Sequence, residues 1–154
     1  MIRDKCGPNI KFLGFDINNA AIKKGNNELG NANSIFKDKI SGSFIEDALT
    51  AWDAKYFGLS IYDRVLYLMS ENEVFNHFKI YGKYFRYVII DDFSHKDSVR
   101  DNGAIFTKND TEILSACGFE IIEESASDHL KNEKFFIENA KKLVFKNQGL
   151  VASL

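Results

Sequence analysis

The chain has 154 residues, of which 45% are hydrophobic and 27% are charged. This length and composition are typical of a globular protein with one core, so we expect residues 1–154 to form a single domain. The net charge is −2 and no basic run occurs, which argues against a nucleic acid or an anionic membrane as partner. The first residues lack the apolar stretch of a signal peptide, and no run approaches the ~20 apolar residues of a membrane span. We therefore expect a cytoplasmic protein.

Short apolar runs alternate with segments of helical periodicity along the chain. The runs predict strands and the periodic segments predict helices; Asn18 or Asn19 can cap the first helix, and Asp110 can cap the last. In chain order, the predicted elements are a strand over 10–15, a helix over 18–29, a strand over 34–39, a helix over 44–56, a strand over 64–69, a helix over 73–81, a strand over 87–90, a polar loop over 94–102, a helix over 109–117, and strands over 119–123 and 142–145.

This alternation of strands and short helices predicts an α/β fold. Right-handed crossovers between parallel strands would place helices on both faces of the sheet. No clear crossover helix separates the last two predicted strands. We therefore expect the last strand to run antiparallel, at an edge of the sheet.

Asp16 provides the first chemical hypothesis. It directly follows the first predicted strand and precedes the first predicted helix. Ligands of open α/β sheets bind beyond the carboxyl ends of the strands, where a carboxylate can accept hydrogen bonds from the hydroxyls of a ribose. The same side chain could instead cap the following helix. The segment alone does not decide between these two roles.

The succession of elements resembles the class I (Rossmann-like) S-adenosylmethionine-dependent methyltransferases. Six segments carry the resemblance and are similar, in this order, to the second through seventh strands of that family: PNIKFLGFDINNAAIKKG, NSIFKDKI, YDRVLYLMSENEV, FRYVIIDDF, CGFEIIEES and KKLVF. The resemblance covers roughly residues 8–146. It implies a three-layer sandwich with a mostly parallel sheet, an antiparallel last strand, and S-adenosylmethionine as the cofactor.

The resemblance also implies roles for individual residues. Asp16 matches the position that binds the cofactor ribose, and Ile17 matches the residue that lies against the adenine ring. Asp38 matches the acidic residue that meets the adenine amino group. Glu71 follows the family's fourth strand and Asp92 follows its fifth, so both are candidates on the acceptor side.

One part of the family's pattern is missing. Its first strand and the glycine-rich loop E/D-x-G-x-G should lie before Pro8, yet only seven residues precede that proline. The glycines of this loop let backbone N–H groups approach the cofactor closely. We therefore expect a sheet that lacks the family's first strand. Either the chain is an N-terminally shortened methyltransferase, which we favour, or a second chain supplies the strand, or the fold has rearranged.

Asp91, Asp92 and His95 form the best alternative site. Two carboxylates and an imidazole within five residues could bind a divalent cation or act as acid and base. Neighbours in one loop rarely converge on a single point, so we favour capping and solvation and predict no metal. His77 lies between Val74 and Phe78 on a predicted helix, and we expect a buried-edge histidine rather than a catalytic base.

The main hypothesis is a methyltransferase-like domain that transfers a methyl group from S-adenosylmethionine to a small-molecule or sugar-like acceptor. The missing glycine-rich loop would leave a shortened chain inactive. The alternative is a non-catalytic binding or interaction module derived from the same fold. The sequence does not name the acceptor.

Overall fold

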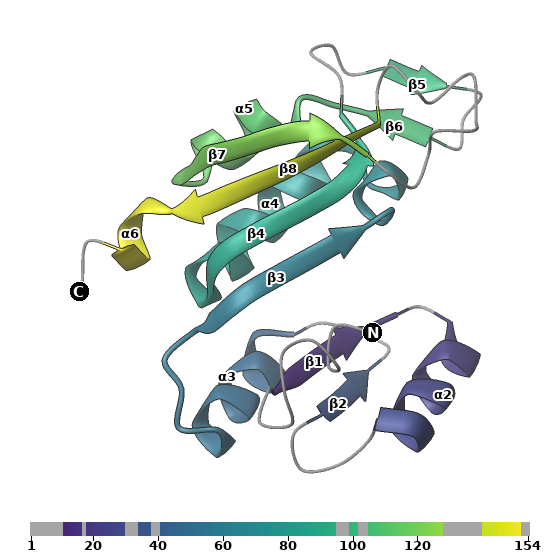
Figure 1. Cartoon of the computed structure of the whole chain (residues 1–154), viewed down its shortest axis with the longest axis vertical. Helices are drawn as coiled ribbons and strands as arrows, with labels where there is room; N and C mark the ends of the chain where they lie inside the picture. Colours follow the sequence, from purple (N-terminus) through teal and green to yellow (C-terminus); the bar gives the residue numbers. More distant parts are fainter. Residues whose placement is uncertain are drawn as a thin grey trace. The chain divides into compact units, whose positions relative to one another are not determined.

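The computed structural model describes residues 11–16, 18–29, 34–37, 41–94, 99–101, 105–127 and 140–151. By its internal packing, the chain divides into two compact units, Met1–Asp53 and Ala54–Leu154 (Figure 1). The single domain expected for residues 1–154 stays a prediction. None of the described helices is long and apolar enough to cross a membrane.

The elements follow one another in an alternating order. They are β1 (Phe12–Phe15), α2 (Asn19–Leu29), β2 (Ser34–Lys37), α3 (Gly42–Ala51), β3 (Phe57–Asp63), η1 (Leu66–Leu68), α4 (Glu71–Tyr81), η2 (Gly82–Tyr84), β4 (Phe85–Phe93), β5 (Val99–Asp101), β6 (Ile105–Thr107), α5 (Asp110–Ala116), β7 (Phe119–Ala126), β8 (Ala140–Asn147) and α6 (Gln148–Val151).

The N-terminal unit contains a parallel pair of strands, β1 and β2, with α2 between them in sequence. Helix α3 packs the ring of Phe44 edge-on against Phe15 of β1, with the ring centroids 6.0 Å apart. Ile45, Ala48 and Leu49 are buried on the same helix. Their spacing of three to four residues is that of an amphipathic helix, as predicted from the sequence.

The C-terminal unit contains a four-stranded sheet in the order β3-β4-β8-β7 (Figure 1). Strands β3 and β4 are parallel, whereas β8 is antiparallel to both of its neighbours. The α/β class and the antiparallel last strand are thus confirmed. The predicted edge position is wrong, because β8 lies between β4 and β7. Its Leu143 and Phe145 are fully buried, while most of β7 is exposed and suits an edge.

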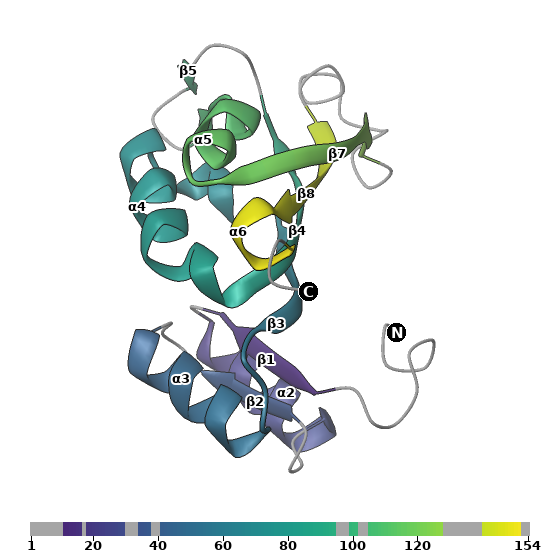
Figure 2. The same ribbon diagram turned by 90° about the vertical axis from the view of Figure 1, so that its left-hand side faces the viewer.

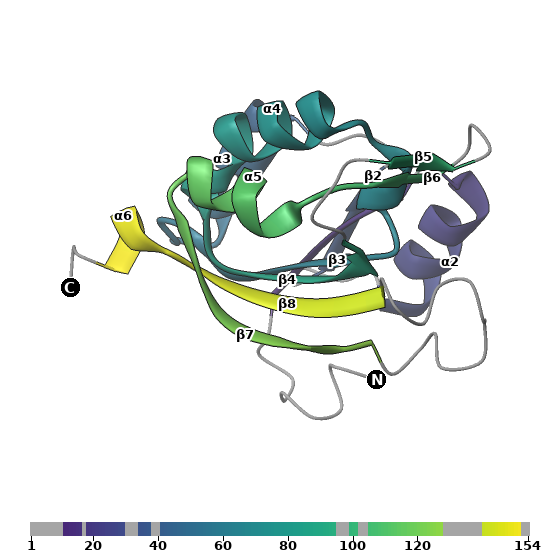
Figure 3. The same ribbon diagram turned by 90° about the horizontal axis from the view of Figure 1, so that it is seen from above.

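Helices α4 and α5 lie on one face of this sheet (Figure 2, Figure 3). Because side chains alternate along a strand, Val88 and Ile90 of β4 point to the same face. They pair with Phe145 and Leu143 of β8, and none of the four has any exposed surface. This apolar layer forms the core of the C-terminal unit. The sheet order begins at β3, and no described strand pairs with β3 on the side away from β4.

The strand predicted over 64–69 is wrong. The strand is β3, which ends at Asp63, and the predicted segment contains the short helix η1 instead. Arg64 turns the chain at a φ of 51° while its N–H donates to the Asp91 carbonyl. The carboxylate of Asp92 then accepts the next three backbone N–H groups, so they are not available to a strand. An apolar run in the sequence does not reveal either contact.

Other differences are small and have local causes. Strand β5 lies within the segment predicted as a polar loop, and it pairs with β6, which begins just after that segment. Helix α4 begins at Glu71 because Ser70 and Glu73 form a capping box. Asn109, rather than Asp110, caps α5 by accepting a hydrogen bond from the N–H of Glu112.

His77 packs inside the C-terminal unit, as predicted. Its Nε2 lies 2.7 Å from the hydroxyl oxygen of Tyr62, and its ring meets Tyr62 and Phe78 edge-on. Burial lowers the pKa of His77 to about 4. The imidazole is therefore neutral at pH 7, and its ring contributes to the packing of the C-terminal unit.

Replacement of Gly82 by alanine tests how tightly the core is packed. A Cβ at Gly82 would lie 2.9 Å from Phe119 Cε2, and this buried ring also packs on Phe78. We expect Gly82→Ala to lower the free energy of unfolding by about 1 to 3 kcal/mol in urea denaturation. Gly58→Ala is the matched control, since no atom lies within 4 Å of a Cβ there. Equal stability of the two variants would contradict this account.

Candidate functional site

Asp16 lies at the carboxyl end of β1 and is exposed. Its Oδ1 accepts a hydrogen bond from the N–H of Asn18 at 2.8 Å. The Oδ1 of Asn18 in turn accepts from Ala20 N–H at 2.9 Å and from Ala21 N–H at 3.4 Å, so Asn18 caps α2. The capping role left open for Asp16 therefore belongs to Asn18. Ile17 and Asp38, the other residues predicted to bind the cofactor, lie outside the described residues.

In the C-terminal unit, the carboxyl ends of the parallel strands β3 and β4 lie side by side. Arg64 follows β3 and adopts a left-handed backbone conformation, which is uncommon for a residue with a side chain. Its N–H donates to Asp91 O at 2.9 Å, and its Nε lies 3.1 Å from Oδ1 of Asp63. Both side chains of this ion pair are half exposed. Strained backbone of this kind is often found where a structure binds a ligand.

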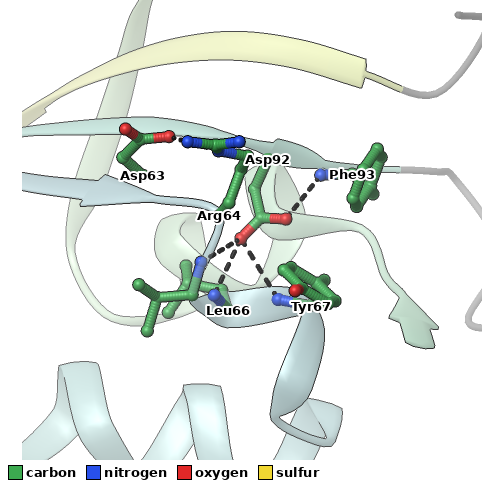
Figure 4. Close-up of polar contacts among 7 residues, drawn as sticks. Asp63, Arg64, Leu66, Tyr67, Asp92 and Phe93 are labelled. Atoms are coloured by element: carbon green, nitrogen blue, oxygen red, sulfur yellow. Dashed lines mark hydrogen bonds and ion pairs between the residues drawn. The ribbon is translucent and has the colours of Figure 1, made fainter. Parts of the chain in front are cut away.

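Asp92 holds the loop that follows Arg64 (Figure 4). Its Oδ2 accepts hydrogen bonds from the N–H groups of Val65 at 3.0 Å, Leu66 at 2.7 Å and Tyr67 at 3.1 Å. Its Oδ1 accepts from Phe93 N–H at 2.7 Å. Burial raises the pKa of Asp92, and the N–H groups of Phe93, Tyr67 and Leu66, together with the charge of Lys108, oppose the shift because they favour the charged form.

Lys108 contacts the same loop. Its Nζ donates to the carbonyl oxygen of Leu66 at 2.6 Å, and only 1% of the side chain is exposed. Burial lowers the pKa of Lys108, while the negative charges of Asp110, Asp92 and Glu71 oppose this shift. The Leu66 peptide is therefore held at its N–H by a carboxylate and at its carbonyl by an ammonium group.

Asp110 is the third charged group of this buried cluster. Its side chain has no exposed surface, and neither carboxyl oxygen has a hydrogen-bond partner among the described residues. Burial raises the pKa of Asp110 to about 7; the nearby charge of Asp92 adds to this shift, and Lys108 and Ser94 oppose it. Two carboxylates thus share one ammonium group, and Asp110 is the one that lacks backbone donors.

Glu71 and Asp92 are the two residues predicted for the acceptor side. The negative charge of each raises the pKa of Lys108. Glu71 is the first residue of α4 and is exposed, whereas Asp92 is fully buried. Any part that Asp92 plays in acceptor binding would therefore go through the loop that it holds. Asp16 belongs to the N-terminal unit and these residues to the C-terminal unit.

Two members of the alternative cation site, Asp91 and Asp92, belong to β4. Asp91 and Asp92 are successive residues of β4, so their side chains point to opposite faces of the sheet. His95 lies outside the described residues, and no metal-binding group of side chains occurs in the part of the chain that the structure describes.

The sequence analysis did not identify Lys108, and it interpreted Asp110 only as a helix cap. The one available signal was a lysine placed two residues before an aspartate at a helix start.

The loop between β3 and α4 combines a hydrogen-bonded backbone with exposed apolar side chains. Leu66 is fully buried beneath it, and Tyr67 packs edge-on against Phe93 at 5.5 Å between ring centroids. Val65 is 47% exposed and Leu68 is 52% exposed. The loop thus presents apolar surface at the edge of the sheet where ligands of α/β folds bind.

Two solved structures that are similar to this chain are described as methyltransferases. A protein from Listeria monocytogenes assigned as an S-adenosylmethionine-dependent methyltransferase superposes with a TM-score of 0.56 at 12% sequence identity, over 94% of this chain and 83% of its own. A SAM-dependent methyltransferase from Leishmania major superposes with a TM-score of 0.50 at 10% identity, over 93% of this chain and 67% of its own. No family model and no curated protein sequence matches the chain. The chain therefore has a Rossmann-like, methyltransferase-like fold.

Removal of the Asp92 carboxylate tests its hold on the loop. Asp92→Ala leaves three loop N–H groups without their acceptor, so we expect the free energy of unfolding to fall by about 3 to 5 kcal/mol in urea denaturation. Asp63→Ala, in the exposed ion pair nearby, should change it by less than about 0.5 kcal/mol. A loss for Asp92→Ala as small as that for Asp63→Ala would refute the role of Asp92.

The buried carboxyl of Asp110 predicts a pH dependence of stability. Its pKa is about 7 in the folded chain, whereas an unfolded aspartate titrates near ~3.9. Between these values the folded state binds a proton that the unfolded state does not, so stability falls as pH rises and levels off above pH 7. At about 1.4 kcal/mol per pKa unit, Asp110→Asn should be more stable than the wild type at pH 8 by about 2 to 4 kcal/mol, and equal to it near pH 4. Parallel stability curves of the two proteins across this range would disprove the prediction.

Proposed function

We propose that this chain is an S-adenosylmethionine-dependent methyltransferase-like domain that acts on a small-molecule or sugar-like acceptor. The observation that carries this function is the fold, which matches solved methyltransferases over 93% and 94% of the chain. The weak net charge of −2 and the lack of a basic run favour a small molecule over a nucleic acid as acceptor. The same features favour a cytoplasmic enzyme with no membrane partner.

The cofactor side is proposed to lie at the carboxyl end of β1. Asp16 fits a ribose ligand because it is an exposed carboxylate at that edge, and because capping of α2 is supplied by Asn18. The resemblance to the methyltransferase family assigns Ile17 to the adenine ring and Asp38 to its amino group, and we include both roles in the proposal. S-adenosylmethionine, when bound, would supply a methyl group on a positively charged sulfur.

The acceptor side is proposed to lie at the carboxyl ends of β3 and β4. Glu71 is exposed there and is the residue proposed to contact the acceptor. Asp92 is proposed to act indirectly, because it holds the backbone of the loop that carries Val65 and Leu68. These two exposed apolar side chains would exclude water around the reacting groups, and a fixed loop would keep the acceptor in position.

A second candidate is favoured by one feature of the sequence. The 154 residues contain no E/D-x-G-x-G segment, the loop with which the family holds the methionine end of the cofactor. A non-catalytic binding module of the same fold would not need this loop. A methyltransferase would need it from elsewhere, and a second chain that completes the sheet is one such source.

Cofactor binding separates these two functions. In isothermal titration calorimetry with S-adenosylmethionine, the methyltransferase function predicts saturable heat for the wild-type chain. Asp16→Asn should weaken binding by about tenfold or more, since charge-assisted hydrogen bonds to the ribose are lost. Asp47→Asn, at an exposed aspartate of α3, is the control and should bind like the wild type. Heat equal to that of buffer for the wild type would favour the non-catalytic module.

A further inference from the structure

The loop from Arg64 to Met69 is held by buried charges of opposite sign. The Asp92 carboxylate accepts the N–H of Leu66 at 2.7 Å, and the Lys108 ammonium donates to the carbonyl oxygen of the same residue at 2.6 Å. The position of Leu66 therefore depends on both side chains. Since Leu66 is fully buried, a shift of either contact moves the loop as a whole.

The buried part of the cluster, which is Asp92, Lys108 and Asp110, contains two acidic groups and one basic group. Asp92 is surrounded by four backbone N–H donors, which favour its charged form. Among the described residues, the groups that shift the pKa of Asp110 are Lys108, Asp92 and the hydroxyl of Ser94, and the negative charge of Glu71 on α4 acts on Lys108. A buried carboxylate without donors or a counterion of its own is costly, so the proton of the cluster is bound by Asp110.

We propose that Lys108 is a positioning residue for the loop and that the protonation of Asp110 sets how firmly Lys108 holds Leu66. When Asp110 is neutral, the ammonium group of Lys108 donates to the Leu66 carbonyl and stabilises the charge of Asp92. When Asp110 releases its proton to solvent, its new negative charge attracts the ammonium group away from Leu66. The loop is then held on the Asp92 side only. The effect of this on acceptor binding rests on the proposed methyl transfer, whereas the movement of the loop does not.

Amide hydrogen exchange of the full chain, followed by NMR between pH 5.5 and 8.5, tests the loop directly. After correction for intrinsic exchange, the protection of the Leu66 and Tyr67 amides should fall about tenfold with a midpoint near 7, the pKa of Asp110. Asp110→Asn should keep the high protection throughout. Asp47→Asn, an exposed aspartate in the other unit, should follow the wild type. Protection that does not change in the wild type, or a step that persists in Asp110→Asn, overturns the inference.

Lys108→Gln separates the charge of Lys108 from its hydrogen bond. A neutral amide can still donate toward Leu66, but ionised Asp110 no longer attracts it, so the step near pH 7 should be absent. A step of unchanged size in Lys108→Gln would overturn the role of Lys108; should this variant not fold, the wild type and Asp110→Asn decide. Titration with S-adenosylmethionine is read separately, because lack of binding contradicts the proposed function and leaves the loop measurement intact.

Discussion

The carboxylate of Asp92 is the contact on which the carboxyl edge of the sheet depends. It joins the end of β4 to the loop that follows β3 by accepting three backbone N–H groups of that loop, and it accepts a fourth from its neighbour Phe93. Burial of a charge is costly unless hydrogen bonds replace the lost water, and here backbone donors and Lys108 do so. The same bonds end the pairing of β3 with β4 and bury Leu66. One side chain thereby decides where a strand stops and which residues reach the surface.

This arrangement makes the charged form of Asp110 unfavourable. Because Asp92 receives the backbone donors, Asp110 is left as a buried carboxyl whose charged form is unfavourable. A chain selected for stability alone would carry an apolar or amide side chain at such a position. The retained carboxyl makes the cluster responsive to a proton near neutral pH. Stability and responsiveness thus oppose each other at a single residue beside the candidate acceptor site.

The methyltransferase-like fold is preserved at 10% and 12% sequence identity, so it depends on the pattern of apolar strands and helices rather than on particular residues. Fold alone does not establish function, which depends on the chemistry of the site. The candidate groups lie in two units, with Asp16 in the first and Glu71, Asp92 and Lys108 in the second. The proposed division between a cofactor side and an acceptor side follows this separation along the chain.

Much of the fold could be predicted from the sequence because it depends on local pattern. The periodicity of α3 and α4, the apolar run of β4 and the acidic residue after β1 are all visible in the order of residues. The strand predicted over 64–69 failed because the run is as apolar as a strand, and only the carboxylate of Asp92, more than 20 residues later, removes its N–H groups from pairing. The edge position predicted for β8 failed for a similar reason, since strand order depends on which faces become buried.

The sequence by itself determined the α/β class and the order of most elements, because these follow from spacing and residue type. The candidate roles of Asp16 and Glu71 come from the resemblance to the methyltransferase family and stay predictions. Only the tertiary structure decided that Asp92 faces inward and that Lys108 and Asp110 share its environment. Burial and charge pairing arise from contacts between residues far apart in the chain, such as Lys108 with Leu66, and no local pattern encodes them.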